Sequence, residues 1–352
     1  MIPAAKPLIG AEERAAVDAV LASGGLAQGP QVAAFEAEFS TLVGERECVA
    51  VNSGTSALHM ALLALGIGAG DEVIVPSFTF AATANAVALT GATPIFADIE
   101  PNSFCIDPEA VAAAITPRTR AIMPVHLYGH PADMDRILPI AQRHGLKVVE
   151  DAAQAHAAAL HGTPVGAFGD AACFSFYPTK NMTSGEGGMV SAAAPQTART
   201  VRLLRNQGME QRYRNEIVGF NTRMTDIHAA IGRVQLGKLA GWTQARRRNA
   251  AFLDRYLENV VTPPVADGAH HVYHQYTIRV PGHDRDAFVS ALAERGVGSG
   301  VYYPVPVHKL PAFGRTLDLP ETARAAAEVI SLPVHPALTE AELEAVVAAV
   351  ND

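Results

Sequence analysis

The sequence predicts an α/β fold with two domains: a large domain at residues 1–240 with a mostly parallel sheet covered by helices, and a smaller C-terminal α+β domain at residues 241–352. From about residue 48 to residue 191, short β-branched or apolar runs alternate with helical patterns, which is typical of βαβ units and a parallel sheet. Beyond residue 225 this alternation gives way to long helical patterns with a single strand candidate. A length of 352 residues is compatible with two domains.

The elements of the large domain follow in order without an internal repeat. Apolar runs such as ECVAV, DEVIVP and LKVVEDA predict buried strands, because they are short and rich in valine and isoleucine. Strands are expected at 47–51, 71–76, 93–99, 120–126, 146–152, 171–177 and 187–192. The intervening segments have helical periodicity, and helices are expected at 55–65, 79–90, 107–115 and 132–145.

The C-terminal part begins with a long helical pattern from residue 225 to residue 260, which could cross between the two domains. The turn signal TPPVADG separates it from a strand expected at 274–280. Helices are then expected at 286–296, 321–330 and 339–350.

Composition excludes several classes of protein. A hydrophobic fraction of 49% and a charged fraction of 18% describe a globular chain with a sizeable core. The net charge of −8 argues against nucleic acid or an anionic membrane as the main partner. The three cysteines form no C-x-x-C pair, and the run HHVYH is interpreted as a strand, so no metal site is expected. Without a signal peptide or an apolar stretch of about 18 residues, the protein is expected to be cytoplasmic.

Polar residues stand where the predicted strands end. Ligands bind at the carboxyl ends of strands in an open parallel sheet, so these residues should converge on one site. They are Ser53 to Ser56, Pro76 and Ser77, His126, Glu150 and Asp151 with Gln154, and Ser175 to Lys180.

Three of these motifs suggest chemistry. In NSGTSALHMAL, Gly54 and its hydroxyl neighbours open a helix whose free amides suit an anion, although an ordinary N-cap would look the same. Asp151 ends an apolar strand, where a carboxylate needs donors or a cation; it could be a helix cap or hold a protonated ring nitrogen. Lys180 could be a surface lysine, or a desolvated nucleophile that captures an aldehyde. Together these groups match the three handles of pyridoxal phosphate (PLP).

The sequence resembles the DegT/DnrJ family of PLP-dependent sugar aminotransferases, which have the fold type I architecture of the aspartate aminotransferase superfamily. The resemblance covers nearly the whole chain, and the combination of S-F-x-x-x-K, G-E-G-G and E-D-A-A-Q is highly specific. Other segments that carry it are SGGLAQGPQVAAFEAEFS, PVHLYGHPADMD, GFNTRMTDIHAAIG and SLPVHPALTEAE.

The resemblance implies a role for each site residue. Lys180 would hold PLP as an aldimine and, once released, move a proton between cofactor and substrate. Asp151 would hold the pyridine nitrogen, Gln154 would lie against the ring or its phenolic oxygen, and Phe80 would stack on the ring unless it is plain core. The phosphate would be bound by Gly54, Thr55, Ser56, Ser175 and, from the neighbouring subunit, Asn221.

Three residues are expected by the same resemblance to line a sugar pocket: Tyr302, Tyr303 and His308 in VYYPVPVHKL. Relatives often have glycine where this chain has Ala157, so an ordinary backbone conformation is expected there. Because Asn221 would come from a second subunit, the active unit should be a homodimer with its site at the subunit interface.

The implied reaction is amino transfer in two halves. L-Glutamate would convert PLP to pyridoxamine phosphate (PMP), and a nucleotide-linked keto-deoxysugar would then accept the amino group, in polysaccharide or antibiotic biosynthesis. The GEGG motif favours the 4-keto position; a 3-keto sugar or an inosose are alternatives. A PLP/PMP dehydratase would have replaced Lys180, and a non-catalytic regulatory homologue should have lost Lys180, Asp151 or the phosphate site. None of these is lost.

Overall fold

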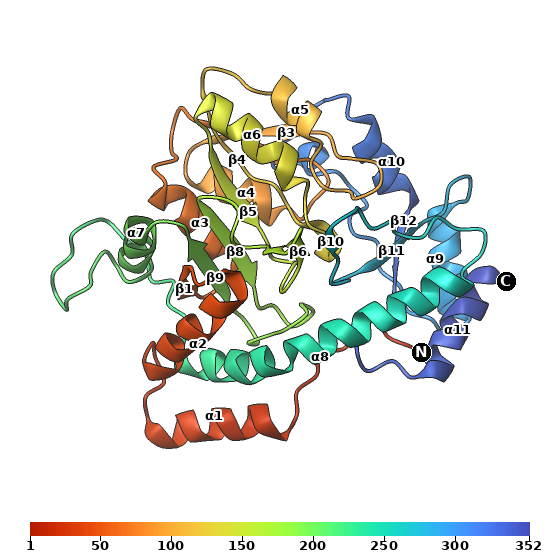
Figure 1. Ribbon diagram of the computed structural model, residues 1–352, viewed down its shortest axis with the longest axis horizontal. Helices are drawn as coiled ribbons and strands as arrows, with labels where there is room; N and C mark the ends of the chain where they lie inside the picture. The colour runs from red at the N-terminus through yellow and green to blue at the C-terminus, as the bar shows by residue number, and fades with distance from the viewer.

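A seven-stranded sheet forms the centre of the computed structural model, which describes residues 1–352 (Figure 1). The strand order is β1-β9-β8-β5-β4-β2-β3. All neighbours from β3 to β8 pair in parallel, whereas β9 is antiparallel to both β1 and β8. The prediction of a mostly parallel sheet is confirmed. The strands are β1 (Glu47–Val51), β2 (Glu72–Pro76), β3 (Thr93–Ala97), β4 (Thr119–Ile122), β5 (Lys147–Asp151), β8 (Ala171–Ser175) and β9 (Gly188–Ala192).

Helices cover both faces of this sheet. Successive residues of its central strands accordingly belong to two different buried clusters, one on each face. Along β2, Val73 and Val75 belong to one buried cluster, whereas Ile74 belongs to another. The resulting strands read as continuous apolar runs, as expected for a sheet buried on both sides. The helices of this part are α1 (Ala11–Ser23), α2 (Pro30–Ser40), α3 (Gly54–Ala64), α4 (Ala82–Leu89), α5 (Pro108–Ala113), α6 (Met134–His144), α7 (Pro195–Arg205) and α8 (Asp226–Tyr256).

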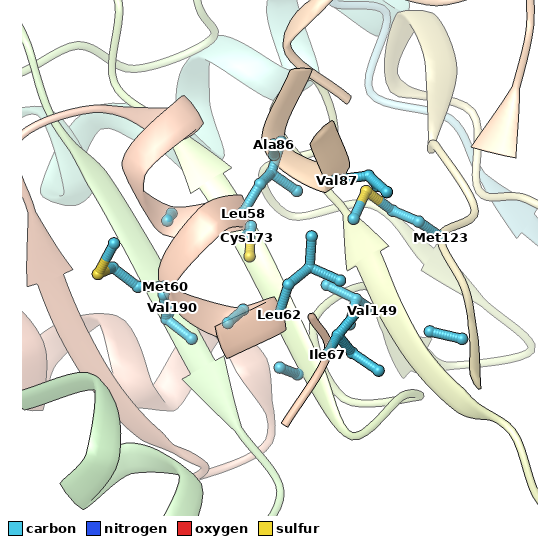
Figure 2. Packing of buried hydrophobic residues seen from close by; sticks show 14 of the residues in the cluster. Leu58, Met60, Leu62, Ile67, Ala86, Val87, Met123, Val149, Cys173 and Val190 are labelled. Atoms are coloured by element: carbon cyan, nitrogen blue, oxygen red, sulfur yellow. The ribbon is translucent and has the colours of Figure 1, made fainter. Parts of the chain in front are cut away.

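Helix α3 is anchored to the sheet by its apolar face. Figure 2 shows Leu58 and Leu62 of α3 among side chains that come from the strands, including Val149 and Cys173. These side chains are at most 2% exposed, and burying each large one stabilises the fold by roughly 1.5–3 kcal/mol. The N-terminus of α3 is therefore held rigidly at the end of the sheet.

The C-terminal part is built on a two-stranded antiparallel sheet of β11 (Tyr276–Arg279) and β12 (Val329–Leu332). The helix expected at 321–330 ends earlier, because Val329 and Ile330 pair with β11 instead of continuing α10 (Pro320–Glu328). Two further helices, α9 (Arg285–Glu294) and α11 (Glu340–Asn351), pack beside this sheet (Figure 1). The N-terminus joins this part through a bridge between Ile2 and Val297.

Helix α8 runs from below the central sheet to the C-terminal part (Figure 1). Residue 240, the expected domain boundary, lies inside this continuous helix, so the boundary stays a prediction. No helix combines the length and the hydropathy that crossing a bilayer requires.

Short elements complete the fold. They are β6 (Ala159–Leu160), β7 (Thr163–Pro164), β10 (Ala269–His270) and the 3₁₀ turns Thr41–Val43, Leu127–Gly129 and Val307–Lys309. Just before β6, Ala157 has a φ of 66°. The expectation of an ordinary conformation at Ala157 was wrong, because this left-handed region strains a residue with a Cβ.

Candidate active site

A cavity of about 630 Å³ opens at the carboxyl ends of the central strands. Its walls come from the N-terminus of α3, the loop after β2, the ends of β5 and β8, and the segment around residue 302. The structure brings together nine of the predicted site residues as lining of this cavity: Gly54, Thr55, Phe80, Asp151, Gln154, Ser175, Lys180, Tyr302 and Tyr303. These residues span about 250 positions of sequence, and the parallel sheet accounts for their convergence.

Lys180 lies in the turn that follows β8. Its backbone N–H donates to the carbonyl of Tyr177 over 2.9 Å, which fixes the turn. Burial lowers the pKa of Lys180 to about 8, although the charge of Asp151 acts in the opposite direction. A substantial fraction of the amine is therefore neutral near physiological pH, which is the form that attacks a carbonyl carbon.

Asp151 is the last residue of β5 and is only 4% exposed. Its Oδ2 accepts a hydrogen bond from the Thr83 hydroxyl at 2.8 Å, and its Oδ1 accepts from the Ala153 amide at 3.2 Å. Burial raises the pKa of Asp151, whereas these two donors and the charge of Lys180 lower it. Since only neutral donors contact it, the carboxylate is suited to a cationic group inside the cavity.

Glu150, the preceding residue, faces the other side of the sheet. Its carboxylate accepts hydrogen bonds at 2.9 Å from the amides of Gly166, Phe168 and Gly169. His126 Nδ1 accepts from the Ala132 amide, so Nε2 carries the proton that it donates to Glu150 over 3.0 Å. The expectation that His126 and Glu150 join the common site was wrong, because neither lines the cavity. Both are structural.

The N-terminus of α3 combines a cap with a close approach to β8. The Ser53 hydroxyl accepts from the Ser56 amide at 3.1 Å and lies 3.0 Å from the Ser56 hydroxyl. A Cβ on Gly54 would lie 2.7 Å from the Cβ of Ser175, so only glycine allows this contact. The first amides of a helix have no intrahelical acceptor, and those of Gly54 and Thr55 start at the cavity wall. Ser56 itself is not among the lining residues.

Gln154 is fixed at both ends of its side-chain amide. Its Oε1 accepts from the Tyr128 backbone amide at 2.7 Å, and its Nε2 donates to the Tyr303 hydroxyl oxygen at 3.0 Å. The Tyr303 proton is therefore free to point elsewhere, and burial raises the pKa of this hydroxyl so that it stays protonated. Phe80 is 58% exposed and lies 6.0 Å from the Tyr303 ring, which makes it a cavity wall and not plain core.

Besides Ser56, two predicted site residues do not line the cavity. His308 is buried with its Nδ1 2.5 Å from the Ser77 hydroxyl oxygen. The expectation that it lines the pocket was wrong, because it is not among the residues that line the cavity. Asn221 is exposed and bridges to Asn206 at the base of the long loop beyond α7. Its expected role involves a second subunit and stays a prediction.

Several lining residues were missed from the sequence: Thr79, Glu186, His274 and Gln275. The run HHVYH was interpreted as structural, and His271 indeed stacks on Tyr273 at 3.9 Å. His274, however, reaches the cavity, with its Nδ1 3.3 Å from Asn181 Oδ1. The prediction of a strand for this run was wrong, because residues 271–274 lie between β10 and β11. A strand pattern therefore gave no indication of which histidine faces the cavity.

The cavity holds little positive charge. Of its 20 lining residues, Lys180 is the only lysine or arginine, whereas Asp151 and Glu186 are acidic. Within this chain, an anionic ligand in the cavity can therefore meet one positively charged side chain, Lys180, and otherwise only neutral donors such as backbone amides and hydroxyl groups.

The residues present fit PLP. Lys180 supplies an amine for the aldehyde, Asp151 a carboxylate for the ring nitrogen, and Phe80 a face for the ring. Because Gly54 lies close to Ser175, the amides of Gly54 and Thr55 and the Ser175 hydroxyl are together available to a phosphate.

Comparison with known proteins agrees with this geometry. The chain matches the DegT/DnrJ/EryC1/StrS aminotransferase family over residues 7–351. It is 45% identical over 320 residues to a UDP-N-acetyl-3-dehydro-alpha-D-glucosamine 3-aminotransferase from Acidithiobacillus ferrooxidans, covering 90% of this chain and 86% of the relative. It is 44% identical over 350 residues to a dTDP-3-amino-3,4,6-trideoxy-alpha-D-glucose transaminase from Streptomyces venezuelae, covering 97% and 92%.

Solved structures agree as well. DesV from S. venezuelae, solved in complex with a ketimine intermediate, superposes with a TM-score of 0.93 at 44% identity, covering 97% of this chain and 94% of that one. NtdA from Bacillus subtilis, solved with bound cofactor PMP, superposes with a TM-score of 0.90 at 34% identity, covering 97% and 82%. The fold type I prediction is confirmed by these structures.

Proposed function

The chain belongs to the DegT/DnrJ/EryC1/StrS aminotransferase family, and on that premise we propose that it transfers an amino group from L-glutamate to a nucleotide-linked keto-deoxysugar. One observation carries the proposal: Lys180 and Asp151 share a cavity with the N-terminus of α3. This arrangement offers an aldehyde-capturing amine, a partner for a ring nitrogen and an anion site within one pocket.

Bound PLP would supply a ring that withdraws electrons from the reacting carbon of the substrate. Asp151 would keep the ring nitrogen protonated, since its carboxylate meets only neutral donors in the chain. The amides of Gly54 and Thr55 and the Ser175 hydroxyl would hold the phosphate at the end of α3. Phe80 would cover the ring and exclude water from it.

Lys180 has two tasks. Its Nζ would hold the cofactor, and once free of that bond the same nitrogen would take up a proton from one carbon and return it to another. A pKa of about 8 suits both tasks, because the amine can accept a proton and give it back near neutral pH.

A homodimer with the site at its interface completes the proposal. Glutamate and a nucleotide are both anionic, whereas the cavity of one chain has a single cation in Lys180. Asn221 is exposed and bridges to Asn206, and the loop between these two residues extends beyond α7 (Figure 1). From there Asn221 could reach the phosphate of a neighbouring copy. Mixing Lys180→Ala chains with Asn221→Ala chains tests this: hybrid dimers would contain one intact site, so activity should return. No recovery after subunit exchange would contradict the shared site.

The position of the keto group has two candidates. The GEGG motif around Glu186 favours a 4-keto sugar by resemblance, and Glu186 lines the cavity. A 3-keto sugar is favoured by the names of the two relatives, which act at position 3. A cyclic ketone such as an inosose is the third acceptor to test.

The deciding experiment follows the cofactor's absorbance. Glutamate should convert the PLP enzyme to the PMP form, and nucleotide 4-keto sugars, 3-keto sugars and inososes are then added one at a time. Recovery of the original band with one compound identifies the acceptor class. Lys180→Ala should abolish turnover, whereas Lys147→Ala, which alters an exposed ion pair with Asp170, should not. A purified protein that binds no PLP would support a regulatory homologue instead.

A further inference from the structure

A chain of two hydroxyl groups leads from the cavity wall to the buried side of Asp151. The Thr83 hydroxyl lies 2.8 Å from Asp151 Oδ2, and the Thr79 hydroxyl lies 3.0 Å from that of Thr83. Thr83, in the first turn of α4, is fully buried, and Thr79 is 2% exposed. Of the two, only Thr79 lines the cavity, so Thr83 can act on a ligand only through other residues.

The direction of these hydrogen bonds follows from the charge of the carboxylate. An ionised carboxylate accepts only, so Thr83 must donate its single proton to Asp151. The Thr79 hydroxyl must then donate to the Thr83 oxygen. Both hydroxyl dipoles therefore point their positive ends toward Asp151, and hydrogen bonds in such a chain strengthen one another.

Burial opposes the charge of Asp151, and the hydroxyl chain offsets this effect. The carboxylate is 4% exposed, and its only other donor from the chain is the Ala153 amide at the longer distance of 3.2 Å. Thr83 is thus its closest donor. The contact joins residues 68 positions apart and ties the start of α4 to the end of β5.

We propose that Thr83, supported by Thr79, is a positioning residue for Asp151: its hydroxyl keeps the carboxylate ionised and oriented so that it can hold the cofactor's ring nitrogen. This inference rests on the proposed function. This role requires the hydroxyl group of Thr83, whereas a purely structural role would require only the volume of its side chain. Because threonine and valine have nearly the same shape, Thr83→Val removes the hydroxyl group and keeps the volume.

The affinity for PMP tests the role without turnover, because PMP binds without a bond to Lys180. Trp242, the only tryptophan of the chain, lines a small cavity together with Lys180 and provides a fluorescence signal. Thr83→Val should weaken PMP binding about 10-fold or more, since a hydrogen bond to a charged group is lost. Thr83→Ser should stay within about 3-fold of wild type, because it keeps the donor.

Two comparisons separate a positioning role from a structural one. Thr322→Val removes a fully buried hydroxyl that has no partner, so it should leave PMP affinity unchanged. In an Asp151→Asn background, Thr83→Val should cost no more than about 2-fold, because the charge through which Thr83 acts is absent. An undiminished effect in that background would overturn the proposal, and so would a Thr83→Ser variant as weak as Thr83→Val.

A Thr83→Val protein that does not fold would shift the test to Thr79→Val, which removes the outer hydroxyl and should weaken PMP binding about 3-fold. Wild-type affinity in that variant would then overturn the hydroxyl chain. If wild-type protein binds PMP and Thr83→Val binds it equally well, only this inference fails. If wild-type protein binds no PMP, the proposed function fails with it.

Discussion

Capture of PLP by Lys180 should follow the pKa that burial gives this amine. An amine reacts only when neutral, and burial lowers the pKa of Lys180 from 10.5 to about 8. At pH 7 about 10% of such an amine is neutral, against about 0.03% of an unperturbed lysine. The structure therefore predicts a roughly 300-fold larger reactive fraction at neutral pH, with a rate that rises with pH and levels off above about 8.

The assay mixes apoenzyme rapidly with PLP between pH 6 and pH 10 and follows the absorbance of the lysine adduct. Dividing each rate by that of Nα-acetyl-lysine at the same pH removes the titration of the cofactor's own groups. This ratio should stay constant below about pH 8 and fall above it, because the free amine continues to gain its neutral form after Lys180 has levelled off. Lys180→Ala should give no adduct at this site. Asp151→Asn should move the midpoint below that of wild type, because the charge of Asp151 raises the pKa of Lys180.

A rate that keeps rising to pH 10, in parallel with the free amine, would refute this reasoning. Lys180 would then titrate as an ordinary exposed lysine, and burial of its amine could not account for its reactivity. A midpoint that moves upward in Asp151→Asn would likewise show that the charge of Asp151 does not raise the pKa of Lys180.

Three further changes have expected outcomes. Gly54→Ala places a Cβ 2.7 Å from that of Ser175, so it should cost about 1–3 kcal/mol in denaturant unfolding and weaken PMP binding; Gly237→Ala, with no atom within 4 Å, should be neutral or stabilising. Glu150→Ala leaves two buried amides and one partly buried amide without an acceptor and should lower stability by about 3–5 kcal/mol, a loss that an unchanged melting temperature would contradict. Ala157→Gly relieves a φ of 66° and should raise stability by up to about 1 kcal/mol; a lower melting temperature would show that the side chain's contacts outweigh the strain.

The fold was predictable because its strands carry a strong local signal. Continuous apolar runs such as the one in β2 need burial on both faces, and their alternation with helical segments indicates a parallel sheet covered by helices. The same reasoning failed at β12. There ETARAAAEVI has unbroken helical periodicity, and Val329 and Ile330 leave the helix only because β11 offers them a partner strand far away in sequence.

The candidate site was predictable where chemistry and strand ends coincide, as at Lys180 and Ser175. His274 and Thr83 were missed because a histidine in a predicted strand and a threonine in a predicted helix have ordinary structural uses. Their relevance arises from contacts with Asn181 and Asp151, which lie 93 and 68 positions away. Contacts of this kind have no local signature.

The pair Glu150 and Asp151 shows how structure assigns roles that sequence leaves equivalent. Successive side chains of a strand point to opposite faces, so only one of two adjacent acids can face the cavity. Glu150 meets three backbone amides and a histidine, and although burial acts against it, these donors hold its pKa below the ordinary value. Asp151 meets one hydroxyl and one amide, and burial raises its pKa.

The fully satisfied carboxylate of Glu150 stabilises the fold, and the under-satisfied carboxylate of Asp151 keeps the capacity to bind a cation. The same difference in donors explains why Thr83, a single hydroxyl, should have a measurable effect on Asp151, whereas no single donor would matter as much to Glu150.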